Sequence, residues 1–233
     1  MSEDARRDEL AANLADVRER IARACADAGR DPAELTLVAI TKTWPAEDVR
    51  RLAALGVRDV GENRDQEAAP KAAALADLDL TWHFVGQLQA NKAASVARYA
   101  HVVQSVDRMR LVAALEHGAA RAGRDLDVLV QVGLEDVEGR GGASAADVPA
   151  LAAAVAGSER LRLRGVMAVA PLGADPAAAF ARLAEVHEHL LRTHPAATWR
   201  SAGMSGDLEQ AVRAGATHLR IGTALLGPRP ALG

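Results

Sequence analysis

The sequence predicts an α/β protein that folds as a single TIM-type (β/α)8 barrel with one extra N-terminal helix, over residues 1–233. Two observations support this prediction. Short apolar segments typical of buried strands alternate eight times with helical segments, as in proteins with a parallel sheet. The 233 residues are enough for eight such units, and no break in composition marks a second domain. A doubly wound open sheet is the alternative that the same alternation allows.

The expected helices repeat apolar residues at intervals of three and four, with charged residues between them. Residues 4–28 form the first, because Leu10, Leu14 and Val17 share one face and Gly29 ends the pattern. The remaining helices are expected after successive strands, over residues 45–55, 64–76, 86–99, 108–122, 145–157, 175–193 and 208–214.

The expected strands are short runs of apolar and β-branched residues, over residues 35–41, 57–60, 80–85, 101–106, 126–132, 161–169, 198–202 and 216–221. In the first strand, Val38 and Ile40 point to one face, and Lys42 shares their parity. If that face lines a closed sheet, Lys42 lies inside the barrel at the carboxyl end of its strand. A lysine is costly to bury, so this position suggests a function. The alternative is a terminal lysine that reaches into solvent.

Composition and charge exclude several classes of function. The formal net charge of -3 has both signs interspersed, so no basic surface is expected for nucleic acid or for membrane lipid. Cys25 is the single cysteine, which rules out a disulfide framework and a cysteine-based metal site. No apolar run approaches the ~20 residues of a membrane span, and the charged N-terminus lacks a signal core. We expect a cytoplasmic protein with no metal site.

Polar residues gather at the expected strand ends, where barrels carry their chemistry. The last two ends stand out, because Ser201-Ala202-Gly203-Met204-Ser205 and Arg220-Ile221-Gly222-Thr223 offer backbone N–H groups and hydroxyls in flexible turns. Such turns can hold a phosphate, and barrels often bind phosphate after strands seven and eight. The alternative is that Ser205 only caps a helix and that Gly203 and Gly222 only permit turns.

A buried lysine opposite a phosphate site indicates a Schiff base with a phosphorylated aldehyde. Two classes fit, a pyridoxal phosphate (PLP) protein and an aldolase that acts on a sugar phosphate. Arg220 could bond a pyridine nitrogen and keep it unprotonated, which would limit carbanion chemistry. An aldolase would need a carboxylate near its lysine, and Glu62 could serve, so both classes stay open.

Seven segments of the chain, in order and with the expected spacing, resemble the pyridoxal phosphate homeostasis proteins, which are single-barrel relatives of the alanine racemase N-terminal domain. The segments are Ala39-Ile40-Thr41-Lys42-Thr43, Gly61-Glu62-Asn63, Trp82-His83-Phe84-Val85-Gly86, Ser105-Val106-Asp107, Arg164-Gly165-Val166-Met167, Gly203-Met204-Ser205 and Arg220-Ile221-Gly222-Thr223. The chain departs from the commonest family pattern at Trp44, Ala202 and Gly133, none of which is an expected cofactor ligand.

The resemblance implies that Lys42 carries PLP as an internal aldimine, that Arg220 faces the pyridine nitrogen and that Asn63 lies near the ring. It also implies that the phosphate is held by Ser205, Gly222 and Thr223, with Met204 beside them. Ser201, at the start of its turn, completes the predicted cofactor-binding residues. The implied role is intracellular PLP (vitamin B6) homeostasis with little or no turnover, and PLP-dependent apoenzymes stay open as recipients of the cofactor.

A PLP-dependent amino-acid racemase is the enzyme alternative within the same fold. Racemisation by two bases needs an acid–base group on each face of the substrate. Lys42 can serve one face, whereas Tyr99, the single tyrosine, is expected away from the strand ends. His83 is the best remaining candidate, although a strand-end histidine that only bonds its neighbours fits as well. We therefore predict no catalytic residues and a monomeric carrier, and assign no role to His83 or to loop 135–142.

Overall fold

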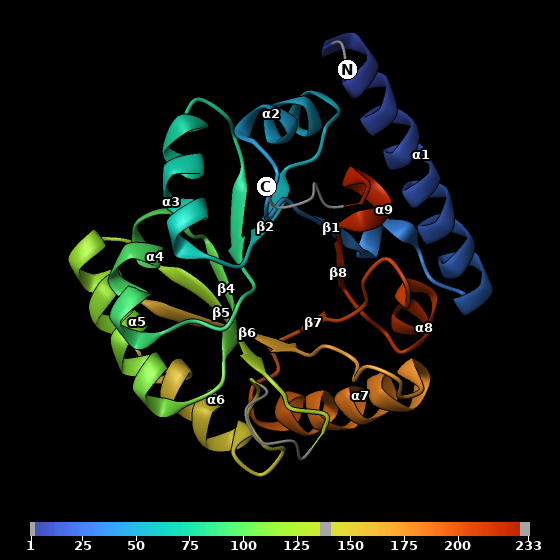
Figure 1. Cartoon of the computed structure of the whole chain (residues 1–233). Helices are drawn as coiled ribbons and strands as arrows, with labels where there is room; N and C mark the ends of the chain where they lie inside the picture. The colour runs from blue at the N-terminus through green and yellow to red at the C-terminus, as the bar shows by residue number, and fades with distance from the viewer. Residues whose placement is uncertain (1–2, 136–140, 229–233) are drawn as a thin grey trace.

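Eight parallel strands close into a barrel in the order of the sequence, which confirms the predicted fold class (Figure 1). The structure is a computed structural model that describes residues 3–135 and 141–228. The strands are β1 (Thr36–Ile40), β2 (Asp59–Glu62), β3 (Thr81–Phe84), β4 (Val102–Val106), β5 (Leu126–Gln131), β6 (Leu161–Met167), β7 (Trp199–Ser201) and β8 (His218–Ile221). β8 pairs with β1, with Thr36 opposite His218 and Ala39 opposite Ile221, and this pairing closes the barrel.

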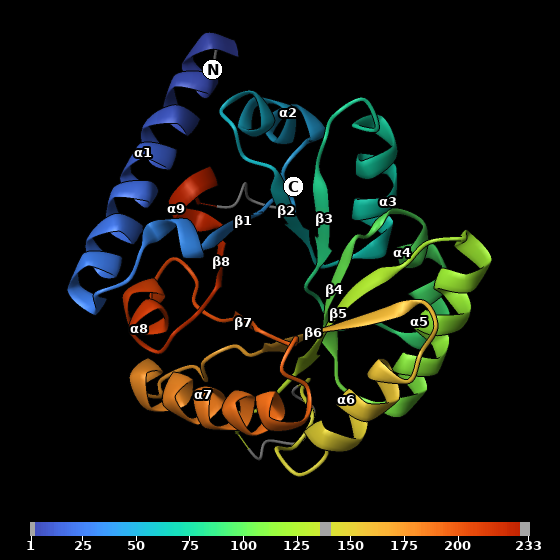
Figure 2. The ribbon, with the colours of Figure 1, turned by 180° about the vertical axis from the view of Figure 1, so that it is seen from behind.

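Helices surround the barrel on its outside (Figures 1 and 2). They are α1 (Glu3–Ala28), α2 (Ala46–Ala54), α3 (Asp65–Ala74), α4 (Ala93–Tyr99), α5 (Met109–Ala122), α6 (Val148–Ala156), α7 (Pro176–Thr193), α8 (Leu208–Arg213) and α9 (Thr223–Leu226), with short 3-10 turns η1 (Pro32–Glu34) and η2 (Ala90–Lys92). No helix among the described residues combines the length and the apolar character needed to cross a membrane.

Two stretches differ from the expected elements. The helix predicted over residues 86–99 is wrong in its first part, because Gln89 is extended and the α-helical part begins only at Ala93. The chain still runs beside the end of β2 at this point, because the N–H group of Val85 donates to the carbonyl oxygen of Glu62 at 2.8 Å and a Cβ atom on Gly86 would lie 2.2 Å from the carbonyl oxygen of Asn63. The sequence also gave no indication of α9, which directly follows the turn at Gly222.

The barrel has an apolar outside and a partly polar inside. Leucine, valine and alanine side chains fill the space between the strands and the helices, in two buried clusters. Inside, Val102, Leu129 and Met167 form a small apolar cluster. Ser201 of β7 bonds Gln104 of β4, and because these strands are not neighbours, the contact must cross the barrel interior.

The sheet contains one irregularity that depends on a glycine. Between β5 and β6 the register shifts at Arg164, which leaves this residue as the extra one of a bulge. The next residue, Gly165, has φ = 152°, and a Cβ atom there would lie 1.8 Å from the carbonyl oxygen of Trp199 on β7. Only glycine therefore allows β6 to approach β7 this closely.

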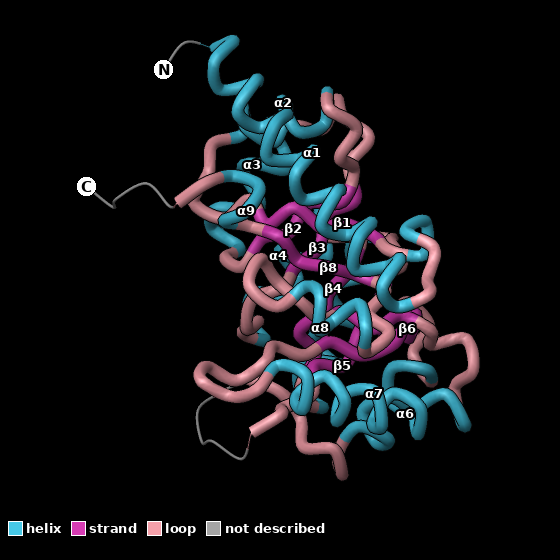
Figure 3. Tube along the Cα trace, turned by 90° about the vertical axis from the view of Figure 1, so that its right-hand side faces the viewer, coloured by secondary structure: helices cyan, strands magenta, loops and turns pink. Residues whose placement is uncertain are grey.

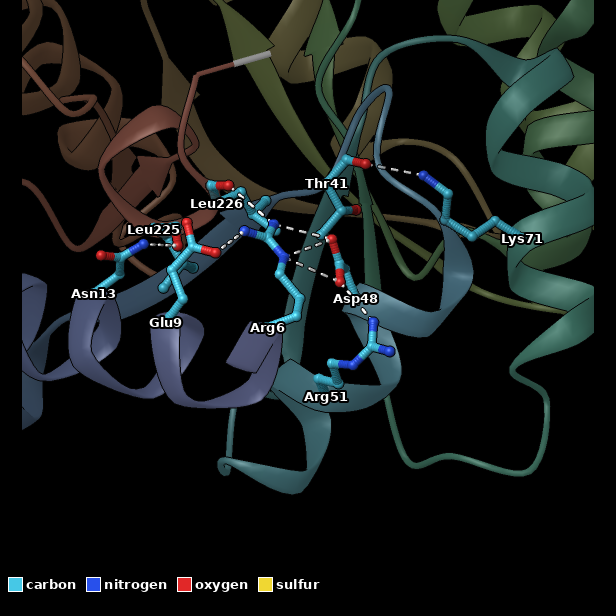
Figure 4. Close-up of polar contacts among 9 residues, drawn as sticks. All are labelled: Arg6, Glu9, Asn13, Thr41, Asp48, Arg51, Lys71, Leu225 and Leu226. Carbon is cyan, nitrogen blue, oxygen red and sulfur yellow. Dashed lines mark hydrogen bonds and ion pairs between the residues drawn. The ribbon is translucent and has the colours of Figure 1, made fainter. Parts of the chain in front are cut away.

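A buried ion pair ties the carboxyl ends of β1 and β2 to α3. Lys71 Nζ lies 2.5 Å from Glu62 Oε1 and donates to the carbonyl oxygen of Thr41 at 2.9 Å, as Figure 4 shows for Thr41. The Thr41 hydroxyl donates to the same Glu62 oxygen at 2.7 Å. Glu62 Oε2 is buried and has no hydrogen-bond partner within the described residues. Burial therefore raises the pKa of Glu62, although Lys71 and Thr41 oppose the rise.

We expect Gly165→Ala to lower the free energy of unfolding by at least about 3 kcal/mol, because it adds a backbone clash to an unfavourable φ. Gly123→Ala is the matched control, since Gly123 also has a positive φ but has no atoms within 4 Å of an added Cβ. The control should cost about 1 kcal/mol. Urea unfolding of the two variants measures the difference, and equal losses would contradict the proposed clash.

We expect Lys71→Met to destabilise the fold at pH 7 by about 3–5 kcal/mol, because it leaves the Glu62 carboxylate buried without its cation. A group whose pKa is raised in the folded state contributes most stability below its unfolded pKa, and loses it as the pH rises. The penalty should therefore shrink as the pH falls from about 7 to about 5. The double variant Lys71→Met/Glu62→Gln should recover most of the loss, and a pH-independent penalty in urea unfolding would contradict this explanation.

Candidate functional site

Lys42 lies in a tight turn directly after β1, at the carboxyl end of the barrel. The N–H group of Trp44 donates to the carbonyl oxygen of Thr41 at 3.1 Å, which places Lys42 and Thr43 at the centre of the turn. Thr43 has φ = 68° and is the one non-glycine residue with positive φ in the described part of the chain. A β-branched residue is unfavourable in this conformation, so the turn that presents Lys42 is strained.

Side chains from two helices, α1 and α3, hold this turn in place. The N–H group of Thr43 donates to Glu67 Oε2 of α3 at 3.1 Å, and Lys71 of the same helix donates to the Thr41 carbonyl. The guanidinium of Arg6 in α1 lies 4.5 Å from the ring centre of Trp44, in cation–π geometry. These contacts offset the strain and fix the backbone on both sides of Lys42.

The two predicted phosphate turns lie side by side and are bonded to each other. The N–H group of Ala224, after the Gly222 turn, donates to the hydroxyl oxygen of Ser205 at 3.1 Å. The first turn is closed by Asp207, whose carboxylate accepts from the N–H group of Met204 at 2.6 Å. Within the described residues, no acceptor is bonded by the backbone N–H groups of Ser205, Gly206, Gly222 and Thr223. Unused donors in adjacent turns can hold an anion, and we call these four N–H groups the anion cradle.

The closure of the barrel brings this cradle next to the Lys42 turn. Gly222 lies against Ile40, two residues before Lys42, because an added Cβ on Gly222 would be 3.5 Å from the Cβ atom of Ile40. The described atoms therefore place a lysine and an anion cradle at neighbouring strand ends, although the two segments are about 180 residues apart in the chain.

Arg220 is buried inside the barrel below these turns. It donates from one terminal nitrogen to the hydroxyl of Ser201 and from the other to the carbonyl oxygen of Ala168, both at 2.7 Å. Neither bond uses its Nε–H group. Burial lowers the pKa of Arg220 to about 10, so its guanidinium stays charged at neutral pH.

A chain of hydrogen bonds continues from Arg220 across the barrel interior. Arg220 can only donate, so the Ser201 hydroxyl accepts from Arg220 and donates its own hydrogen to Gln104 Oε1, at 2.7 Å. The Gln104 amide then donates to His83 Nδ1 at 2.9 Å, and His83 Nε2 donates to Asp59 at 2.9 Å. With Gln104 Oε1 assigned as the acceptor from Ser201, each bond in this chain runs in one direction, and both ring nitrogens of His83 are used.

His83 thus bonds its neighbours inside the barrel, which is one of the two readings that the sequence left open. His218 lies beside it, with ring centres 6.3 Å apart, and burial lowers the pKa of His218 to about 4. This ring therefore stays neutral at neutral pH.

Tyr99 lies on the outer side of the sheet, and its buried hydroxyl makes no hydrogen bond within the described residues. Burial and the nearby Asp65 raise the pKa of Tyr99.

A cavity of about 840 Å³ opens between the loops that follow β5, β6 and β7. Met204, Gly206 and Asp207 bring the first phosphate turn to its edge, and Met204 is the one predicted site residue in its lining. Gln131 donates to the carbonyl oxygen of Gly141 at 3.0 Å on the opposite side. Residues 136–140 of loop 135–142 lie outside the described residues.

Sequence reasoning missed several residues that support the site. Gln104 could have been recognised, because it is a large polar residue at the centre of a strand whose five residues are all buried. Lys71 gives no comparable signal within its alanine-rich helix. Asn63, half-buried at the end of β2, is placed by its close contact with Gly86.

Comparison with known proteins gives a consistent picture. The family model described as alanine racemase, N-terminal domain, matches residues 6–230. The pyridoxal phosphate homeostasis protein of Mycobacterium leprae is 45% identical over 241 residues, which cover 96% of this chain and 94% of that protein. The protein of the same name from Pseudomonas aeruginosa is 44% identical and covers 94% of this chain and 96% of its own length.

Solved structures show the same fold. PipY of Synechococcus elongatus, solved with PLP bound, superposes with a TM-score of 0.82 at 36% identity, over 94% of this chain and 100% of its own. The alanine racemase of Streptomyces coelicolor superposes with a TM-score of 0.72 at 20% identity, over 58% of its length, which shows a shared fold alone. By its nearly full-length matches, this chain belongs to the pyridoxal phosphate homeostasis protein family, built on the alanine racemase N-terminal fold.

Proposed function

We propose that this protein binds PLP covalently through Lys42 and takes part in PLP homeostasis as a carrier, with little or no turnover of its own. The observation that carries the proposal is the placement of Lys42 beside the anion cradle of the Ser205 and Gly222 turns, across the β1–β8 pairing. A phosphorylated aldehyde needs both features, an amine for the carbonyl carbon and donors for the phosphate.

The residues present fit both the phosphate group and the pyridine ring of PLP. The unused N–H groups of the two turns and the hydroxyls of Ser205 and Thr223 can hold the phosphate, with Met204 beside them. Arg220 can donate to a pyridine nitrogen but cannot accept a proton from it, so it favours the unprotonated ring. Asn63, which lies near Lys42 at the next strand end, is proposed to contact the ring, and Ser201 to act through Arg220.

When bound, PLP supplies an aldehyde that condenses with primary amines and an aromatic ring that can draw electrons from them. An unprotonated ring nitrogen weakens that second property. Racemisation also requires a second proton-transfer group, and neither candidate among the described residues is placed to provide it. His83 has both nitrogens engaged, and Tyr99 lies outside the sheet with a raised pKa. These features support a binding role over catalysis.

The alternatives differ in what they require of the same site. A racemase would need a partner for Lys42 on the opposite face of its substrate, and an aldolase would need a carboxylate facing the lysine. Glu62 is held on the α3 side by Lys71 and Thr41, away from that role. We further propose that residues 1–233 work as one monomeric unit and that PLP-dependent apoenzymes are the recipients of the cofactor.

Borohydride reduction of the PLP-loaded protein should leave a pyridoxyl group on the peptide that contains Lys42. The Lys42→Ala variant should lose the adduct and the yellow colour, whereas Lys92→Ala, a lysine of η2 after the third strand, should keep both. Peptide mass spectrometry identifies the modified lysine. A colourless parent protein, or a sugar phosphate trapped on Lys42 in place of a pyridoxyl group, would overturn the proposal.

Alanine racemisation by the PLP-loaded protein should be at least about 100-fold slower than by a dedicated racemase, because neither His83 nor Tyr99 is placed to act as the second acid–base group. Chiral chromatography of L-alanine incubated with the protein measures the inversion. The Lys42→Ala variant provides the background rate. Inversion at a rate comparable to that of a true racemase would show that the chain is an enzyme.

A further inference from the structure

The two phosphate turns lead into unusually short helices. α8 has 6 residues and α9 has 4, whereas α1 has 26. Helices this short are not stable by themselves, so their positions must come from packing against other elements. Figures 1 and 2 show α1 running along α8 and α9 on the outside of the barrel, and the residues of α1 contact both. Figure 3, from the side, shows α1 lying across the strands.

Three polar side chains of α1 reach backbone carbonyls at or directly after the phosphate turns. Arg6 donates to Leu226 and Asn13 donates to Leu225, both at 3.0 Å, as Figure 4 shows. Arg20 donates to the carbonyl oxygen of Ser205 at 3.1 Å. These residues are spaced by seven, close to two helical turns, so they lie on one side of α1 and span about 21 Å along it.

Arg6 also connects these turns to the Lys42 turn. Besides the Leu226 carbonyl, it binds the buried carboxylate of Asp48 in α2 at 3.0 Å and stacks on Trp44. Its charge is balanced by Asp48 and Glu9, and Arg20 is balanced by Glu209 at 2.9 Å. Asn13 is neutral. Because the cations are paired, their effect on a bound phosphate comes from placing the backbone more than from long-range attraction.

We propose that α1 positions the anion cradle, with Asn13 and Arg20 as positioning residues and Arg6 linking the cradle to the Lys42 turn. This inference rests on the proposed binding of PLP. Loss of either Asn13 or Arg20 lets its turn shift, so that the N–H groups of Ser205, Gly206, Gly222 and Thr223 no longer converge. The substitution therefore weakens the binding of the phosphate group, whereas the reaction of Lys42 with the aldehyde is unchanged.

The test compares PLP with pyridoxal, which carries the same aldehyde and ring but no phosphate. The full-length chain, freed of cofactor, is titrated with each compound and followed by its absorption. We expect Asn13→Ala and Arg20→Gln each to weaken PLP binding roughly 3- to 10-fold, because each removes one hydrogen bond to a phosphate turn or the helix after it, with pyridoxal binding unchanged. Arg23→Gln is the matched control, because Arg23 lies on the same helix and pairs with Glu19 at the surface.

Each outcome of the titration decides between explanations. If the variants weaken both compounds equally, or weaken neither, or if Arg23→Gln acts as Arg20→Gln does, α1 does not position the cradle. If the parent protein binds PLP no better than pyridoxal, the phosphate site itself is wrong, and the proposed function fails with it. Asn13→Ala changes no charge, so a selective loss of PLP binding in this variant excludes a purely electrostatic effect. The melting temperature of each cofactor-free variant reports general destabilisation separately.

Discussion

The pairing of β1 with β8 is the contact on which the rest of the site depends. It joins the first and last strands, with Ala39 opposite Ile221, and so places the turn after β1 beside the turn after β8. A shift of one residue in this register would turn the side chains of β8 to the opposite face, and Arg220 would leave the interior. On its other side β1 pairs with β2, where Val38 and Ile40 pack against Gly61 and leave no space for a larger residue.

The interior of the barrel shows how a buried arginine can be tolerated. Isolated burial of a guanidinium would be very costly, but Arg220 donates to Ser201 and Ala168, and the bonds continue through Gln104 to His83. Each member of the chain satisfies its neighbour, so the removal of one would leave another without a partner. The same chain holds His83 in one tautomer, with both ring nitrogens engaged. The residues that orient Arg220 thus also fix the ring of His83.

The sequence predicted the order and type of almost all elements, because hydrophobic periodicity and glycine or proline at the ends are local properties. It also predicted that Lys42, Arg220 and both glycine turns lie at strand ends that the barrel brings together, since the carboxyl ends of parallel strands meet at one end of a barrel. Local patterns could not predict α9 or the start of α4. The chain after β3 stays beside Asn63 as far as Gly86, and α9 packs against α1, which is about 200 residues away in the chain, so neither feature follows from a local pattern.

The least predictable part of the molecule is the network that holds the site from outside the barrel. Arg6, Asn13 and Arg20 look like ordinary polar residues of a surface helix, and their common target becomes visible only when α8 and α9 are in place. The strained backbone at Thr43 also depends on distant contacts, since threonine keeps this conformation only where surrounding residues hold it. Hydrogen bonds from α3 and the stacking of Arg6 on Trp44 hold it here. A barrel alone therefore places the strand ends, whereas contacts from α1 and α3 give the Lys42 turn and the phosphate turns their final geometry.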